Sequence, residues 1–261
     1  MDADFIPKLR ELARKYNAAE NLQVELEDGA VKIRCDKGSF RFYYDFSMKL
    51  PQDEYTPVPL YHWQAQPKYI QLKGLLDRKM VTPALAMRIH HLVPHGEFTS
   101  GLKDILVFET ELFQFITGQQ VDKVFADFSG EVYTNCIMST TGNVKASMEL
   151  GLLPDGSEPV LLHELVGRNG VASDLPVDIQ TVQYPIYVFK GKETLKYNEI
   201  DYELYGMNNT QADCIRFILS VLKEPERVRT LQESFSHIEK VVQAAKKASA
   251  TLCYTSVEVC K

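Results

Sequence analysis

Short segments in which apolar and polar residues alternate, separated by glycine-containing turns, constrain this 261-residue chain most. The first group covers residues 22–44, with turns at Asp28-Gly29 and Lys37-Gly38. Alternation with period two places the apolar residues on one face of a strand, and turns with Gly suit tight hairpins. This pattern predicts a three-stranded β-meander, preceded by an amphipathic helix over residues 4–17.

Strand and helix patterns continue through the rest of the chain. Strands are predicted over residues 85–93, 132–138, 144–150, 160–166, from 171, 184–189, 193–197 and 251–259. Helices are predicted over 67–79 and 103–117, from near Thr210, where a capping box with Asp213 is expected, and from Pro225. Helices grouped before and after long strands, without repeating βαβ units, indicate an α+β fold. We expect a large, mostly antiparallel sheet with helices packed on one face, plus the small N-terminal helix and meander.

These segments divide the chain into three parts. Residues 1–50 hold the helix and meander, residues 51–66 read as a Pro-rich surface linker, and residues 67–261 form the α+β domain. The linker contains Tyr61-His62-Trp63, which includes the only tryptophan. These rings either cover a ligand or partner surface or pack in the ordinary way, and ordinary packing is our expectation.

Composition excludes several classes of function. The net charge of −6, from 35 acidic and 29 basic residues, gives no electrostatic basis for binding nucleic acid. Five scattered cysteines without a CxxC pair indicate neither a disulfide framework nor a zinc knuckle. This cysteine usage is typical of a protein in a reducing cytosol. No apolar run approaches the roughly 18 residues of a membrane span, and no signal peptide is evident. We therefore expect a cytoplasmic protein with no membrane partner.

Residues 101–118, Gly-Leu-Lys-Asp-Ile-Leu-Val-Phe-Glu-Thr-Glu-Leu-Phe-Gln-Phe-Ile-Thr-Gly, carry a family resemblance. They resemble the helix of Gfo/Idh/MocA oxidoreductases that reads D-x-G-x-H-x-x-D and ends at a glycine, with Asp104 as the first acid and Gly118 as that glycine. The turn at residues 166–171 and the closing helix Glu226–Ser249 are also similar to that family. Over residues 67–259, the chain therefore resembles the family's C-terminal half, which binds substrate and forms oligomers.

The departures from the family pattern concern catalysis. In the family a Rossmann domain precedes this half and supplies the nicotinamide site and a Glu-Lys-Pro segment with the catalytic lysine. This sequence has no Glu-Lys-Pro and no GxGxxG after a strand. Phe108 stands at the catalytic histidine position of the helix, and Glu111 at the second acid. Since phenylalanine cannot relay a proton, the resemblance implies a chain without the NAD(P)-binding domain and the catalytic pair, and no NAD(P) cofactor is expected.

The same helix carries the candidate substrate-binding residues. Asp104, Phe108 and Glu111 fall on one stripe together with Phe115. In the family that stripe faces the substrate, so the acids would accept hydrogen bonds from a polyol and the rings would stack on it. The alternative is that the acids are solvated and the phenylalanines belong to the core.

A histidine cluster is the candidate metal site. His90, His91, His95 and Glu97 are the densest group of possible metal ligands, and imidazole with carboxylate suits a divalent ion. His90 and His91 are adjacent on a strand, so they should point to opposite faces. The alternative is a polar strand end with a turn at Pro94. The pair His163-Glu164, in an apolar strand, is a weaker candidate.

Three functions remain open. The first is a non-catalytic member of the oxidoreductase family that binds a sugar-like ligand and forms a homo-oligomer through its open sheet face, or works beside a full-length oxidoreductase relative. The second is a metal-assisted lyase or isomerase acting on a carbohydrate or keto-sugar, with the histidine cluster and the helix acids. The third is a structural oligomerisation module.

Overall fold

The structure is a computed structural model that describes residues 4–46, 53–94, 101–174, 186–190, 193–197, 201–204 and 206–259. The chain forms two compact units. Unit 1 comprises Met1–Tyr43, Gln52–Ala65 and Pro176–Val228, and unit 2 comprises Tyr44–Pro51, Gln66–Leu175 and Arg229–Lys261. No helix of the described residues combines the length and the hydropathy needed to cross a bilayer.

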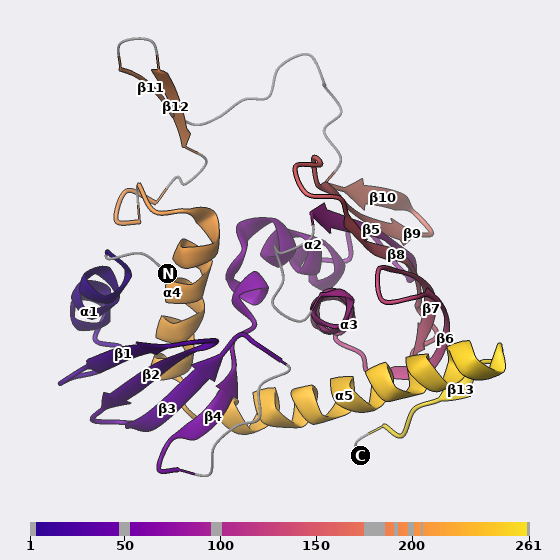
Figure 1. The fold of residues 1–261 in the computed structure, drawn as a ribbon, viewed down its shortest axis with the longest axis horizontal. Helices are drawn as coiled ribbons and strands as arrows, with labels where there is room; N and C mark the ends of the chain where they lie inside the picture. Colours follow the sequence, from indigo (N-terminus) through magenta and orange to yellow (C-terminus); the bar gives the residue numbers. More distant parts are fainter. Residues whose placement is uncertain are drawn as a thin grey trace. The chain divides into compact units, whose positions relative to one another are not determined.

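Unit 1 contains the predicted helix and meander. Helix α1 (Phe5–Lys15) precedes a four-stranded sheet in the order β1 (Gln23–Glu27), β2 (Ala30–Cys35), β3 (Gly38–Tyr43) and β4 (Thr56–Pro59). The three-stranded meander is antiparallel, and β4 pairs parallel with β3 (Figure 1). Phe5, Leu9 and Leu12 make the buried stripe of α1, as their helical spacing predicts.

Within the segment that the sequence predicts as a surface linker, residues 51–66, the structure has β4 and a short 3-10 helix, η1 (His62–Ala65). Tyr61 and Trp63 are buried there, and their ring centroids lie 5.3 Å apart. A strand is tolerated despite its prolines because β4 is an edge strand, where a missing backbone N–H leaves no sheet hydrogen bond unmade. Ordinary packing of these aromatic side chains is what the structure has.

The rest of unit 1 is the pair β11 (Ile186–Lys190) and β12 (Glu193–Tyr197), and helix α4 (Asn209–Lys223), which contacts α1 and η1. The N-terminus of α4 differs from the prediction. Asn208 is the N-cap, and its side chain accepts a hydrogen bond of 2.9 Å from the backbone N–H of Gln211. Thr210 already lies inside the helix, so the predicted capping box is wrong, because the asparagine two residues earlier satisfies the free N–H.

Unit 2 is built on a seven-stranded sheet. Its strands, in spatial order, are β10 (Gly170–Ser173), β9 (Val160–Gly167), β5 (Ala84–Pro94), β8 (Lys145–Leu153), β7 (Tyr133–Thr140), β6 (Val121–Ser129) and β13 (Thr255–Ser256). Only β5 and β8 pair parallel among the neighbours in this described sheet. The prediction of an α+β fold with a large, mostly antiparallel sheet is therefore confirmed.

Two strands of this sheet differ from the sequence prediction. Strand β6 was not predicted, because its buried residues Val121, Val124 and Ala126 do not alternate strictly across a bulge. The strand predicted over 251–259 shrinks to the two residues of β13, because α5 (Arg227–Thr251) continues further than expected.

Helices cover one face of the sheet. Met87, Ile89, His91 and Val93 of β5 are buried on that face, while Arg88 and His90 lie on the other. Helix α3 (Leu102–Thr117) packs against β5 and β8 and also contacts α2 (Pro67–Asp77). Because α3 has partners on several sides, nearly all of its side chains are buried. Gly118 ends α3 in the left-handed conformation, as predicted.

Candidate functional site

A buried carboxylate held between two imidazoles lies at the centre of unit 2. Glu109 of α3 is fully buried, and its Oε1 lies 2.5 Å from Nδ1 of His91 on β5. Nε2 of His163 on β9 lies 3.2 Å from both carboxylate oxygens. A carboxylate removed from water needs such partners, because desolvation of an ion costs several kcal/mol.

The interactions continue beyond His163. Its Nδ1 lies 2.9 Å from Oδ2 of Asp174, and its backbone N–H donates a 2.7 Å bond to Oδ1 of the same carboxylate. The Lys68 ammonium, at the start of α2, donates to Oδ2 of Asp174 over 3.1 Å. The residues Lys68, Asp174, His163, Glu109 and His91, in this order, form what we call the acid–imidazole chain.

Sheet register explains how distant residues meet here. Ile89 of β5 pairs with His163 of β9, so His163 shares the face on which His91 also lies. Helix α3 packs over that face and places Glu109 between the two imidazoles. The hairpin from β9 to β10 returns the backbone alongside His163, where the N–H of Asp174 donates to the His163 carbonyl over 3.1 Å.

Aromatic rings enclose both imidazoles. The ring of Tyr69 meets His163 edge-on at 5.0 Å between centroids, and the ring of Phe108 meets His91 edge-on at 5.2 Å. Tyr69 and Phe108 also contact each other, at 6.2 Å. The Lys68 ammonium lies 4.6 Å from the centre of the Tyr69 ring, in the range of a cation–π contact. These rings exclude water and strengthen the electrostatic interactions between the enclosed charges.

Neighbouring charges in the acid–imidazole chain shift the pKa values of its carboxyl and imidazole groups. Burial by itself raises the pKa of Glu109, but the His163 charge and the hydrogen bonds from both imidazoles lower this pKa to about 2. Burial by itself lowers the pKa of His163, but the Glu109 charge and the bonds to Asp174 and Glu109 raise it to about 9. The pKa of Asp174 falls to about 2, since its hydrogen bonds with His163 outweigh burial. At neutral pH a protonated His163 therefore lies between two ionised carboxylates.

The acid–imidazole chain is poorly suited to acid–base catalysis. Both carboxylates and the His163 imidazole are engaged, and a carboxylate with a pKa of about 2 is a weak base at neutral pH. Lys68 is the more exposed end, with about a third of its side chain accessible. The arrangement holds a proton and ties α3 to the sheet.

The predicted substrate residues lie on α3 beside this chain. Asp104 and Glu111 are each 3% exposed, and Phe108 is 8% exposed. Of the alternative, the part in which the two acids are solvated is wrong, because α3 is covered on the faces that carry them, and the part that assigns Phe108 to the core is confirmed. Phe108, at the position of the expected catalytic histidine, packs between His91 and Tyr69.

The predicted metal ligands divide between two places. His90 and His91 lie on opposite faces, as predicted, and bond to different carboxylates: His90 to Glu149 at 2.8 Å, and His91 to Glu109. His95 and Glu97 lie outside the described residues. Within the described ranges, no three His, Cys, Asp or Glu side chains are placed to bind one metal ion.

The sequence does not predict the two central residues of the acid–imidazole chain. Glu109 lies next to the predicted stripe of Asp104 and Glu111, and the sequence indicates His163 only as a weak candidate metal ligand. The available signal was a histidine at a core position of an apolar strand, which needs a polar partner in the fold. That partner, Glu109, is 54 residues away and could not be named from sequence spacing.

Comparison with solved structures identifies the fold. Similar structures include myo-inositol 2-dehydrogenase from Lactobacillus plantarum (14% identity, TM-score 0.54), covering 78% of this chain and 66% of that one. They also include scyllo-inositol dehydrogenase from Lactobacillus casei with bound NAD(H) and scyllo-inositol (13%, TM-score 0.52), covering 77% and 65%. A myo-inositol dehydrogenase from Corynebacterium glutamicum is similar at 11% identity and a TM-score of 0.55, covering 78% and 65%.

The match is structural and partial. The chain spans slightly less than two thirds of the length of these dehydrogenases. No protein-family model and no curated protein sequence matches it. At these identities the similarity concerns the fold, and it confirms the fold that the sequence resemblance implies. The chain has a fold shared with inositol dehydrogenases of the Gfo/Idh/MocA type.

Proposed function

We propose that this chain is a sugar- or polyol-binding protein with a dehydrogenase-type fold, acting as an oligomeric or partner subunit without transferring a hydride itself. The observation that carries the proposal is Phe108, which lies between two buried carboxylates, Asp104 and Glu111, on one stripe of α3. Hydrophobic rings with a few placed polar groups are typical of sites for small ligands.

Hydride transfer to or from a hydroxyl carbon needs a group that takes or returns the hydroxyl proton. Phe108 has no such group, and it fills its position by packing against His91 and Tyr69. The nearest alternative on the helix, Glu109, is bonded to two imidazoles, which keep its pKa at about 2. These features favour binding over catalysis at this helix.

A polyol suits the chemistry of the stripe. Carboxylates accept hydrogen bonds from hydroxyl groups, and aromatic rings pack against the apolar face of a sugar ring. The similar structures include enzymes named for myo-inositol and scyllo-inositol. Inositols are therefore the first ligands to test.

We also propose that α1 and the meander of unit 1 do not form a nicotinamide site. Dinucleotide binding in the Rossmann manner needs a strand that leads through a Gly-rich turn into a helix, whose N-terminus holds the pyrophosphate. In unit 1, β1, β2 and β3 are joined by hairpins, and α1 precedes them. We therefore expect that a cofactor, where one is needed, comes with a partner chain.

The open face of the unit 2 sheet supports the subunit role. Arg88, His90 and Ile137 lie on the face away from α3, and Ile137 is exposed. A large antiparallel sheet with one uncovered face commonly buries it in a symmetric dimer. Sedimentation equilibrium should therefore give a dimer or larger oligomer, and a monomer at tens of micromolar would contradict this part of the proposal.

Ligand binding is tested by thermal shift and calorimetry on the full chain with myo-inositol, scyllo-inositol and a panel of sugars. We expect saturable binding of at least one polyol, lost in Asp104→Asn. Asp127→Asn, an exposed acid on β6, is the matched control and should bind normally. A flat response to the whole panel, or binding that survives Asp104→Asn, would contradict the proposed site. Titration with NADH should show no binding, and micromolar affinity would contradict the expected absence of a cofactor site.

A further inference from the structure

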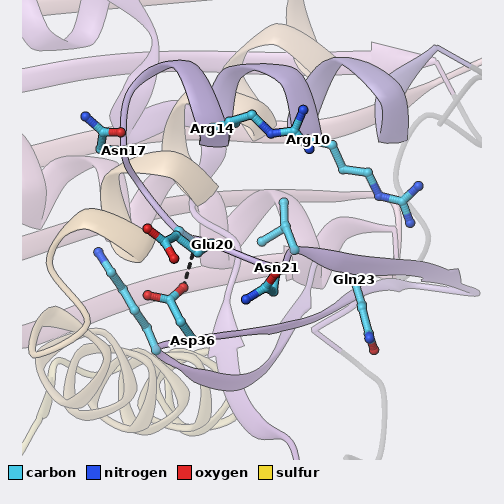
Figure 2. Close-up of a pocket in the computed structure, with 10 residues that line it drawn as sticks. Arg10, Arg14, Asn17, Glu20, Asn21, Gln23 and Asp36 are labelled. Carbon is cyan, nitrogen blue, oxygen red and sulfur yellow. Dashed lines mark hydrogen bonds between the residues drawn. The ribbon is translucent and has the colours of Figure 1, made fainter.

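Unit 1 contains a cavity of about 650 Å³ that the proposed function does not use. It lies beside the C-terminal half of α1, the loop from α1 to β1, and the turn between β2 and β3 (Figure 2). Its volume falls in the range of small-molecule sites, about 300–1,000 Å³. Most of the residues that line it have polar side chains, with guanidinium, carboxylate, carboxamide and ammonium groups.

Hydrogen bonds hold two walls of the cavity together. The backbone N–H of Glu20 donates to Oδ1 of Asp36 over 2.6 Å, and the N–H of Asp36 donates to the Glu20 carbonyl over 3.3 Å (Figure 2). The Lys37 ammonium donates a 2.8 Å bond to the carbonyl of Leu222, at the end of α4. Because these bonds fix the loop against the turn, the cavity is organised before any ligand binds.

Two arginines line the helical wall without a partner of their own. Arg10 and Arg14 are one helical turn apart on α1, so their side chains are neighbours on the helix surface (Figure 2). Neither guanidinium makes a hydrogen bond or ion pair within the described ranges of the chain. Arg14 is in the last turn of α1, where a cation interacts favourably with the helix dipole, but Arg10 lies before that turn. A guanidinium group with free donors is suited to bind a phosphate bidentately.

Acidic and amide side chains line the opposite wall. Glu20 and Asp36 both present carboxylates there, and Asn21 adds a carboxamide (Figure 2). These groups are acceptors and donors for hydroxyl groups. Asn17 and Asn21 also hold left-handed backbone conformations, with φ of 50° and 53°, a conformation in which asparagine is enriched over other side chains.

We propose that this cavity binds a phosphorylated sugar or polyol, with the phosphate on Arg10 and Arg14 and the hydroxyl groups on Glu20 and Asp36. The two arginines supply the charge that the phosphate needs, and the two acids select a ligand that also carries hydroxyl donors. Inorganic phosphate would bind only the arginines, and a neutral sugar would bind only the acids. The site is separate from the α3 stripe and lies in the other unit.

Isothermal titration of the full chain tests the proposal with glucose 6-phosphate, fructose 6-phosphate and myo-inositol 1-phosphate, compared with inorganic phosphate, glucuronate and glucose. We expect a sugar phosphate to bind at least tenfold more tightly than inorganic phosphate and glucose. Arg10→Gln and Arg14→Gln should each weaken that binding at least tenfold, and Glu20→Gln should weaken it while leaving inorganic phosphate unaffected. Lys8→Gln is the matched control, since Lys8 is on the same helix, outside the cavity, and should bind as the wild type does.

The outcomes separate this site from the α3 site. Binding of a sugar phosphate that is kept in Asp104→Asn and lost in Arg14→Gln supports the cavity. Binding lost in Asp104→Asn and kept in both arginine variants would overturn the cavity proposal and leave the proposed function standing. No binding of any of the three sugar phosphates at millimolar concentration would overturn it as well. Equal binding of inorganic phosphate or glucuronate would overturn the assignment of a phosphorylated, hydroxylated ligand.

Discussion

Glu109 is the residue on which the buried charges of unit 2 depend. In Glu109→Gln the side chain keeps its size but loses its charge, and the protonated His163 keeps only Asp174 as a counter-charge. Removing one partner from a buried ionic group costs about 3–5 kcal/mol when the remaining charge is left uncompensated. Because Asp174 still compensates His163 in part, we expect the free energy of unfolding in urea to fall by up to about that amount at neutral pH.

The matched control is Glu149→Gln, on the other face of the same sheet. Glu149 bonds to His90 at 2.8 Å, so the pair has similar geometry, but both side chains are more than a third exposed. A solvent-exposed pair contributes about 0–1 kcal/mol, so this variant should unfold almost like the wild type. Equal decreases in the free energy of unfolding in the two variants would contradict a stabilising effect that depends on the burial of the acid–imidazole chain.

At the scale of single residues, the sequence indicates which polar side chains matter but not which of them bind each other. Asp104, Phe108 and Glu111 were predicted to share a stripe of α3, and they lie on that helix as buried residues. The interactions of Glu109 with His91 and His163 depend on strand register and helix packing. Those are set by the whole sheet, and one sequence cannot give them.

Helix α4 gives a prediction at the scale of one element. The Asn208 side chain caps its first turn by accepting the N–H of Gln211, and losing an N-cap costs about 1 kcal/mol. Asn208→Ala should lower the free energy of unfolding by about that amount, measured in urea. Asn208→Asp keeps the acceptor and should be neutral, and Thr210→Ala should change little. A larger loss in Thr210→Ala than in Asn208→Ala would favour the capping box that the sequence predicted.

Elements were predictable where local pattern decides them. The meander has strict alternation and Gly turns, and α3 ends at Gly118 with φ of 66°, a conformation that glycine adopts without strain. Strand β6 was missed because a bulge near its start breaks the alternation of its buried residues. Strand β4 was missed because its prolines suggested a loop, and its pairing with β3 is a tertiary contact.

At the scale of the whole molecule, His62 in unit 1 and His163 in unit 2 have pKa values altered in opposite directions, while burial lowers the pKa of His237 in unit 2 as it does that of His62. Burial lowers the pKa of His62 in unit 1 to about 4, so this imidazole is neutral in the folded chain. In unit 2 the pKa of His163 is about 9, raised by Glu109 and Asp174 against the effect of burial. Protonation therefore affects the stability contributed by His62 and by His163 in opposite directions, on either side of the ordinary histidine pKa of about 6.5.

The pH dependence of stability follows from these signs. The stability contributed by His163 is complete below pH 6.5 and is lost as the pH rises to about 9, because the unfolded chain releases this proton first. That contributed by His62 is complete above pH 6.5 and is lost as the pH falls to about 4. Glu109 and Asp174, whose pKa values fall from 4.5 and 3.8 to about 2, add a further loss below about pH 4.5.

We therefore expect the free energy of unfolding to be greatest near pH 6.5 and to decline on both sides, with a slope of at most about 1.4 kcal/mol per pH unit for each proton involved. Urea titrations from pH 3 to pH 9, followed by circular dichroism, measure this curve. Glu109→Gln should flatten the alkaline side, because the pKa of His163 then returns toward its ordinary value. His62→Gln should reduce the slope of the acid side between pH 6.5 and 4, where His237 still contributes, and leave the alkaline side unchanged. Stability that rises steadily from pH 6.5 to 9 would contradict a protonated His163 in the folded chain.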